Sequence, residues 1–193
     1  MSPAAQHPTP REPMRPSRRA VARGAAWSVP VIAVGAAAPA MAASPTPCPT
    51  LPAFSATDGW VISEAGTPTA GSARFASGTF VVDSDAQPLS SYSASASHSL
   101  DVVNGQSYTF QYSWTALTSN PNPMTSELLI DGTLVPGSLV DTTTSGPGGS
   151  VSATYVASAT GTVTVAVRMS TSDSSFESGD DITVGAITID CGT

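Results

Sequence analysis

The sequence predicts an all-β protein, an antiparallel β-sandwich of about 8 to 10 strands. Two observations favour this fold. From residue 54 onward, apolar residues alternate with Ser, Thr and other polar residues, which is the period of a strand with one buried face. Short stretches rich in Gly, Pro, Asn and Asp separate these segments, and none has the spacing of an amphipathic helix.

The clearest predicted strand spans residues 108–114. Aromatic residues occupy every second position, and Thr109, Gln111 and Ser113 lie between them. Successive side chains of a strand point to opposite faces, so the four aromatic rings share one face. A sandwich buries that face, and we therefore expect three of these residues in the core: Tyr108, Phe110 and Tyr112.

A second strand is predicted over residues 92–102, where a row of serines alternates with inward positions. Those inward positions are Tyr92, Ala94, Ala96, His98, Leu100 and Val102. We expect His98 to be a core histidine with satisfied hydrogen bonds. Asn104-Gly105 is a strong signal for a tight turn. It predicts a β-hairpin between this strand and the aromatic strand.

A short hairpin and two further strands follow along the chain. Asp131-Gly132 predicts a type I′ turn, and hence a short hairpin that returns at Leu134. Alternating apolar residues predict a strand over 151–157. After a turn at Gly161, Val and Met residues alternate with polar ones and predict another strand over 163–169.

The last predicted strand contains a fault in its alternation. Apolar residues occupy even positions up to Val184 and odd positions from Ile187, so the phase changes at Gly185-Ala186. A β-bulge adds one residue to a strand and lets both halves face the core. We predict such a bulge at this point.

The first 42 residues have the pattern of a removable signal peptide. A basic segment precedes an apolar stretch over 24–38, and small residues end at Ala42, after which we predict cleavage. The alternative is a membrane anchor. The apolar run of about 15 residues is shorter than the roughly 20 that span a bilayer, which disfavours such an anchor. Because there is no sorting motif, lipobox cysteine or C-terminal hydrophobic tail, we expect no stable membrane anchor after cleavage.

The run from Ser17 to Arg23, with Arg18 and Arg19 paired, resembles the twin-arginine signal of bacterial Tat substrates. This resemblance implies the Tat export machinery and a signal peptidase as partners. The general secretory route is the alternative. Either route predicts a secreted protein, extracellular or at the cell envelope.

Cleavage would divide the chain into a signal peptide over 1–42, a Pro-rich lead-in over 43–53 and a single β-sandwich domain over 54–193. Five of the seven basic residues lie in the first part, together with one of the fourteen acidic residues. The formal charge therefore changes from −7 to −11 when that part is removed. Such an acidic chain makes nucleic acid an unsuitable partner.

Cys48 and Cys191, near the two ends of the predicted domain, are the two cysteines of the chain. In a protein sent to an oxidising compartment, they are expected to form a disulfide. The alternatives are two free thiols or a metal pair. Because the processed chain would keep a single histidine, a zinc site would be short of ligands.

The order of several short motifs resembles the galactose-binding-like jelly rolls, the fold of many bacterial carbohydrate-binding modules. These motifs are Gly59-Trp60, Gly105-x-x-Tyr108-x-Phe110, Thr154-Tyr155-x-Ala157 and Asp180-Asp181-Ile182-x-Val184. The resemblance implies a jelly-roll sandwich that binds glycans without catalysis. In that chemistry the apolar face of a sugar lies on an aromatic ring, and its hydroxyls bond to polar side chains.

Four aromatic residues are candidates for such a ligand site: Trp60, Tyr92, Trp114 and Phe176. Trp60 and Trp114 lie at strand ends, where packing in the core or at its edge is the favoured role. Tyr92, near Pro88, and Phe176, in a serine-rich loop, are expected to be exposed.

Carboxylates gather before the last strand, at Glu177, Asp180 and Asp181, and also at Asp83-Ser84-Asp85. The resemblance implies structural calcium, with the first group as candidate ligands. The alternative is a solvated acidic loop, because neither group has the spacing of a loop-encoded calcium site.

We predict that the protein is not an enzyme, since it has no Gly-x-Ser-x-Gly motif and no lysine. The predicted function is secreted glycan binding. The alternatives are a structural or adhesive surface protein without a small ligand and, less favoured, a hydrolase that uses two acidic residues.

Overall fold

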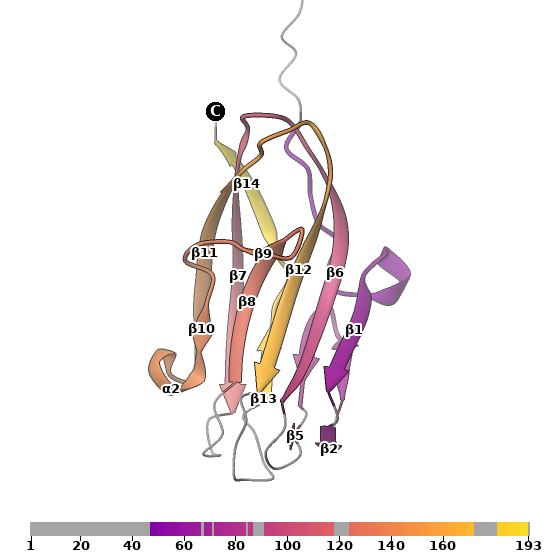
Figure 1. Ribbon diagram of the computed structural model, residues 1–193, viewed down its shortest axis with the longest axis vertical. Helices are drawn as coiled ribbons and strands as arrows, with labels where there is room; N and C mark the ends of the chain where they lie inside the picture. The colour runs from indigo at the N-terminus through magenta and orange to yellow at the C-terminus, as the bar shows by residue number, and fades with distance from the viewer. Residues whose placement is uncertain are drawn as a thin grey trace, which may run out of the picture. The chain divides into compact units, whose positions relative to one another are not determined.

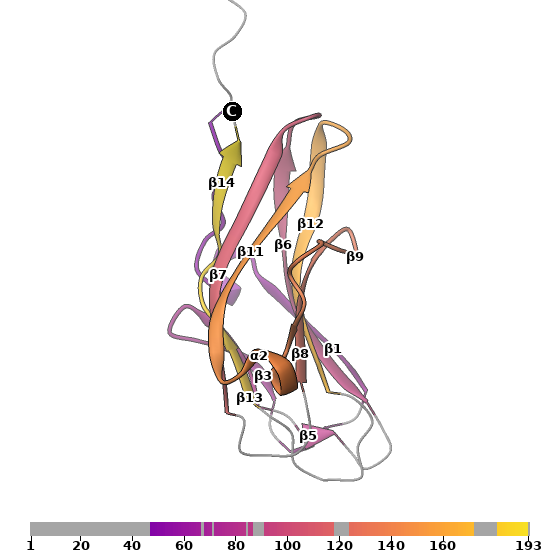
Figure 2. The ribbon, with the colours of Figure 1, turned by 90° about the vertical axis from the view of Figure 1, so that its left-hand side faces the viewer.

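Residues 47–192 form an antiparallel β-sandwich in the computed structural model, which describes residues 47–66, 68–70, 72–83, 85–86, 91–117, 124–171 and 181–192. Two six-stranded sheets pack face to face, as Figure 2 shows edge-on. This confirms the predicted fold class. The strands of the described part are numbered up to β14, which is more than the predicted 8 to 10. The number is higher because several strands have only two to four residues. The signal peptide and its cleavage site lie outside the described residues.

Sheet I contains the serine-rich strand, which lies between the edge strand and the central strand of the sheet (Figure 1). Its strand order is β1 (Val61–Gly66), β6 (Tyr92–Val102), β12 (Gly161–Thr171), β8 (Met124–Ile130) and β10 (Val140–Asp141), with β9 (Thr133–Leu134) also paired to β8.

Sheet II contains the aromatic strand. Its strand order is β11 (Gly148–Val156), β7 (Ser107–Leu117), β13 (Asp181–Val184), β4 (Thr79–Val82) and β3 (Ala73–Ala76), with β14 (Thr188–Gly192) also paired to β7. Three other short features are a ribbon of β2 (Pro68–Ala70) and β5 (Asp85–Ala86), the 3₁₀ turn η2 (Ala56–Asp58) and the single helical turn α2 (Thr142–Ser145).

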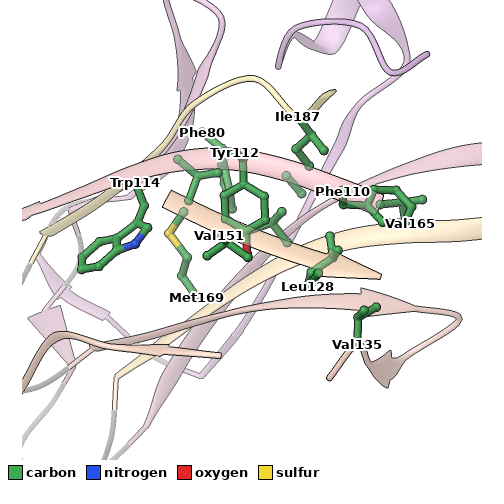
Figure 3. Close-up of a cluster of buried hydrophobic side chains, with 14 of the residues drawn as sticks. Phe80, Phe110, Tyr112, Trp114, Leu128, Val135, Val151, Val165, Met169 and Ile187 are labelled. Atoms are coloured by element: carbon green, nitrogen blue, oxygen red, sulfur yellow. The ribbon is translucent and has the colours of Figure 1, made fainter. Parts of the chain in front are cut away.

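The core lies between the sheets, where the inward side chains of β7 meet those of β8 and β12. Tyr108, Phe110 and Tyr112 are buried, as predicted. Figure 3 shows the last two in one cluster of buried side chains with Leu128 and Val165 of sheet I. The period-2 pattern therefore identified both the strands and their inner faces.

The predicted hairpin between the serine-rich and aromatic strands is wrong. β6 pairs with β1 and β12, whereas β7 pairs with β11, β13 and β14, so the two strands lie in different sheets. Asn104-Gly105 does form a turn, with Gly105 at φ 78° and its N–H bonded to Ala157 O at 2.8 Å. The turn takes the chain from β6 in sheet I to β7 in sheet II. Each strand has one apolar face, and placing them in opposite sheets buries both faces against each other.

The hairpin predicted at Asp131-Gly132 is confirmed. β8 and β9 pair on either side of it, and both turn residues have positive φ, 49° and 77°, as a type I′ turn requires. A second turn of this kind, Ser77-Gly78, joins β3 to β4 and was not predicted.

The bulge predicted at Gly185-Ala186 is confirmed by the register of the last two strands on β7. Val184 pairs with Trp114 and Thr188 with Gln111, so three residues of the last segment oppose two of β7. Ile187 is buried just after the extra residue. A Cβ on Gly185 would lie 2.7 Å from Ser113 Oγ, so glycine allows the close approach of the two strands.

The disulfide predicted between Cys48 and Cys191 is present and joins residues 143 positions apart. It ties the segment before the first strand to β14. Among the described residues, none forms a helix long and apolar enough to cross a membrane.

His98 lies on the inward side of β6 but is only partly buried. Its Nε2 is 3.1 Å from Asp58 O and its Nδ1 is 2.6 Å from Ser99 O. Both ring nitrogens thus have partners, as expected for a satisfied histidine at the edge of the core.

Candidate functional site

Trp60 is part of the core. Its side chain is 2% exposed, and its ring lies 4.4 Å from that of Phe54 and 5.2 Å from that of His98. The indole N–H donates to Pro52 O at 3.1 Å. Both the ring and its donor are used inside the protein, so Trp60 presents no free group to a ligand.

Tyr92 is also buried, at 1% exposure, so the expectation that it is exposed is wrong. It begins β6, and its N–H donates to Thr171 Oγ1 at 3.1 Å. Its alternation with Ala94 sets its direction, and this outweighs its nearness to Pro88. Phe176, the fourth candidate, lies outside the described residues.

Trp114 differs from the other two described candidates. Its side chain is 4% exposed, but it lies at the floor of a cleft between the edges of the two sheets. Within the described part of the chain, its indole N–H makes no hydrogen bond. A donor without a protein partner at the base of a cleft is available to a ligand.

We call this region the Trp114 cleft. Its volume is about 390 Å³. Its lining comes from β7, from the edge strand β11 and from the segment that contains β10 and α2: Trp114, Gly137, Leu139, Val140, Ser145, Gly148, Gly149, Ser150, Val151 and Ser152.

Gly149 makes the floor of the cleft possible. It pairs with Trp114 across β11 and β7, and a Cβ at this position would lie 3.3 Å from the indole nitrogen. A side chain there would lie against the N–H, which makes no hydrogen bond to a residue in the described part of the chain. Trp114 belongs to the buried core cluster, and the cross-strand glycine places no side chain against its indole nitrogen.

The wall opposite β11 is held by a helix cap. Asp141 is the N-cap of α2, and its carboxylate accepts the Thr143 N–H at 2.9 Å. Hydrogen bonds from the Thr143 side chain and backbone lower the pKa of Asp141. The cap fixes the turn that presents Ser145, while Leu139 stands 57% exposed in the same segment.

The Trp114 cleft thus combines an aromatic edge, an exposed aliphatic side chain and several hydroxyls, and it contains no charged residue among its described lining. Hydroxyls both donate and accept hydrogen bonds, as sugar hydroxyls do. The arrangement suits a neutral ligand that has both apolar and hydroxyl surfaces.

A second pocket, also of about 390 Å³, lies beside the β3–β4 turn. We call it the Phe75 pocket, lined by Phe54, Ser55, Ala56, Thr57, Phe75, Ser77 and Gly78. The ring of Phe75 is half-buried and stacks on Phe54 at 6.2 Å. Ser55 and Thr57, however, bond to each other at 2.7 Å, so their hydroxyls are partly used. Sequence reasoning missed this pocket.

The carboxylates predicted as calcium ligands do not form a described site. Glu177 and Asp180 lie outside the described residues, and Asp181 is in β13. In the described part of the chain, no group of three or more His, Cys, Asp or Glu residues is placed to hold a metal ion.

Asp83, from the other acidic group, is engaged within the protein. Its carboxylate forms an ion pair with Arg74 and accepts the Ser72 N–H at 3.1 Å. Burial raises the pKa of Asp83, but these two partners lower it by more, so the net shift is downward. Asp83 therefore behaves as a structural anion at the edge of sheet II.

Comparisons with known proteins show no family for this chain. No protein-family model matches the chain, and no curated protein matches it. Among solved structures, the chain is similar to one described as "CBM4 structure and function", with TM-score 0.42 and 16% identity over 69% of this chain and 86% of that one. It is also similar to the EclA C-terminal domain, described as a sugar-binding protein, with TM-score 0.39 and 10% identity over 78% of this chain and 84% of that one.

Proposed function

We propose that this protein is a secreted, non-catalytic β-sandwich that binds a neutral glycan in the Trp114 cleft. One observation carries the proposal: the indole N–H of Trp114 has no hydrogen bond to any described residue and lies at the floor of a cleft lined by hydroxyls. Trp60, whose N–H is bonded to Pro52 O, serves the core instead.

The chemistry of the cleft supports a sugar more than a charged or purely apolar ligand. Ser145, Ser150 and Ser152 supply hydroxyls, and Leu139 and the indole edge supply apolar contact. Ligand sites in proteins combine apolar walls with a few polar groups in this way. The described lining contains no carboxylate that could act as a general acid or base, so the proposal is binding alone.

A glycan array with the full chain, its disulfide intact, tests this proposal, with and without calcium. We expect binding to at least one neutral glycan, and a loss of at least about tenfold in affinity for Trp114→Phe, which removes the indole N–H and part of the ring. Calorimetric titration of the best glycan measures that loss.

The matched control is Trp60→Phe, the same change at an indole that has its own partner. This variant is expected to keep the affinity of the parent chain. Equal losses in the two variants, or no binding to any glycan, would speak against the cleft.

A second candidate function is a structural or adhesive surface protein. The outer face of sheet I favours it, because every second residue of β6 from Ser93 to Ser99 is a serine, and Thr162 and Thr164 lie on the neighbouring strand. Arg168 and Glu127 form an ion pair within this face. An array on which no glycan binds would support this second function.

We also propose export through the twin-arginine route, which carries folded proteins. We expect Arg18→Lys and Arg19→Lys together to leave the precursor in the cell and to abolish secretion, because the paired guanidinium groups are the recognised feature. Immunoblots of cell and medium fractions measure this. Normal secretion of the variant would indicate the general secretory route instead.

A further inference from the structure

The two sheets expose several free edges, and all but one of those described are short or carry a charge. β1 contains Glu64, β3 contains Arg74 and β14 contains Asp190, while β9 and β10 have only two residues each. Charges and short length on an edge prevent pairing with another chain. These edges are therefore protected.

β11 is the exception. It is an edge strand of nine residues, Gly148–Val156, and it contains neither a charged residue nor a proline. Its even-numbered residues from Gly148 to Val156 are exposed, and Val156 is 58% exposed. A long, uncharged edge of this kind is a template for strand pairing.

The ladder between β11 and β7 shows which backbone groups are free. The Ala157 N–H donates to Gln106 O at 3.0 Å just beyond one end of the strand, and Pro147 O accepts the Ala116 N–H at 2.8 Å at the other. The backbone N–H and C=O groups of odd-numbered residues thus point toward β7. Those of even-numbered residues point away from β7. For Ser150, Ser152 and Thr154, no hydrogen bond of these outer groups to a described residue is present.

We propose that β11 is a self-association edge, through which two copies of the chain pair antiparallel and extend sheet II across a twofold axis. A second copy fits because a strand paired antiparallel with itself is self-complementary, as a twofold interface requires. The net charge of −7 makes copies of the chain repel each other, but β11 contains no charged residue and brings no like charges together at the seam.

The register follows from the direction of the free groups. Placing Ser152 opposite its own copy sets Ser150 opposite Thr154 and Val151 opposite Ala153. Even-numbered residues then face even-numbered residues, so their outward N–H and C=O groups meet. The facing hydroxyls would pair as Thr109 and Thr154 do at 3.0 Å within one chain.

Sedimentation equilibrium of the full chain over a concentration series, without glycan, tests the proposal. We expect the average mass to rise from 19.4 kDa toward twice that value. Ser152→Pro removes one outward N–H and no bond to β7, so it should keep the fold but weaken association at least about tenfold. Circular dichroism confirms that the sheets are retained.

Ser152→Lys gives a second, independent disruption by placing like charges opposite each other. Its control is Gln111→Lys, which places the same charge on the adjacent residue of β7, away from the edge. Only the first should abolish association. A chain that is monomeric at every concentration, or a dimer that survives both Ser152 variants, would overturn the proposal. Because Ser152 also lines the Trp114 cleft, glycan is left out, and neither result decides glycan binding.

Discussion

Replacing Cys48 and Cys191 by serine is expected to lower the free energy of unfolding by up to about 5 kcal/mol. The disulfide closes a loop between residues 143 positions apart, so its loss gives the unfolded chain far more freedom. Typical domains are stable by about 5–15 kcal/mol, so this loss would leave the fold marginal. Urea denaturation of the double variant and the parent chain measures the difference.

The parent chain treated with a reductant provides the control for this prediction. Reduction breaks the same link without changing any residue, so the two unfolding midpoints should agree. A double variant that unfolds at the same urea concentration as the oxidised parent would show that the link adds nothing to stability.

Phe110→Ala is the second large effect, an expected loss of about 3–5 kcal/mol with the disulfide intact. Phe110 is 0% exposed, lies on an inner strand of sheet II and belongs to the buried cluster that also contains Val165 of the opposite sheet (Figure 3). Truncation leaves a cavity between two sheets that are each fixed by their own ladders, so the core cannot close around it. Thermal and urea unfolding measure the loss.

Tyr112→Phe, two residues along the same face, is the matched control. Within the described part of the chain, the Tyr112 hydroxyl is buried without a hydrogen-bond partner, and burial raises its pKa. Removing the hydroxyl should keep or raise stability, by about 1 kcal/mol. In the unfolded chain this tyrosine ionises near its ordinary pKa of about 10, so the parent loses stability above that pH, and the variant should lose less. A large loss of stability in Tyr112→Phe would contradict the finding that the hydroxyl has no hydrogen-bond partner among the described residues.

The sequence pattern predicts strands and their inner faces well, because burial of one face imposes a period of two. The aromatic strand, the hairpin at Asp131-Gly132 and the bulge at Gly185 all follow from residues that are close in the chain. The turn at Asn104-Gly105 shows what a local pattern cannot predict, namely which strands pair. A turn signal fixes the reversal of the backbone, but only the competition between whole apolar faces decides whether the next strand pairs with the last or crosses to the other sheet.

The candidate site was predictable only in part. The position of Trp114 near the end of its strand marked it as a candidate, but Trp60 and Tyr92 carried similar signals and are buried. What distinguishes Trp114 is Gly149 across the ladder and Leu139 from a separate segment. Such neighbours are set by register and sheet order, which a local pattern does not contain.

The indole N–H of Trp114 allows the most direct test of the central claim. The chain has three tryptophans, so a ¹⁵N-labelled sample gives three indole signals, assigned through the Trp60→Phe and Trp114→Phe variants. On titration with the best glycan from the array, we expect the Trp114 signal to shift while the Trp60 signal stays in place. A shift of the Trp60 signal alone, or of no indole signal, would contradict glycan binding in the Trp114 cleft.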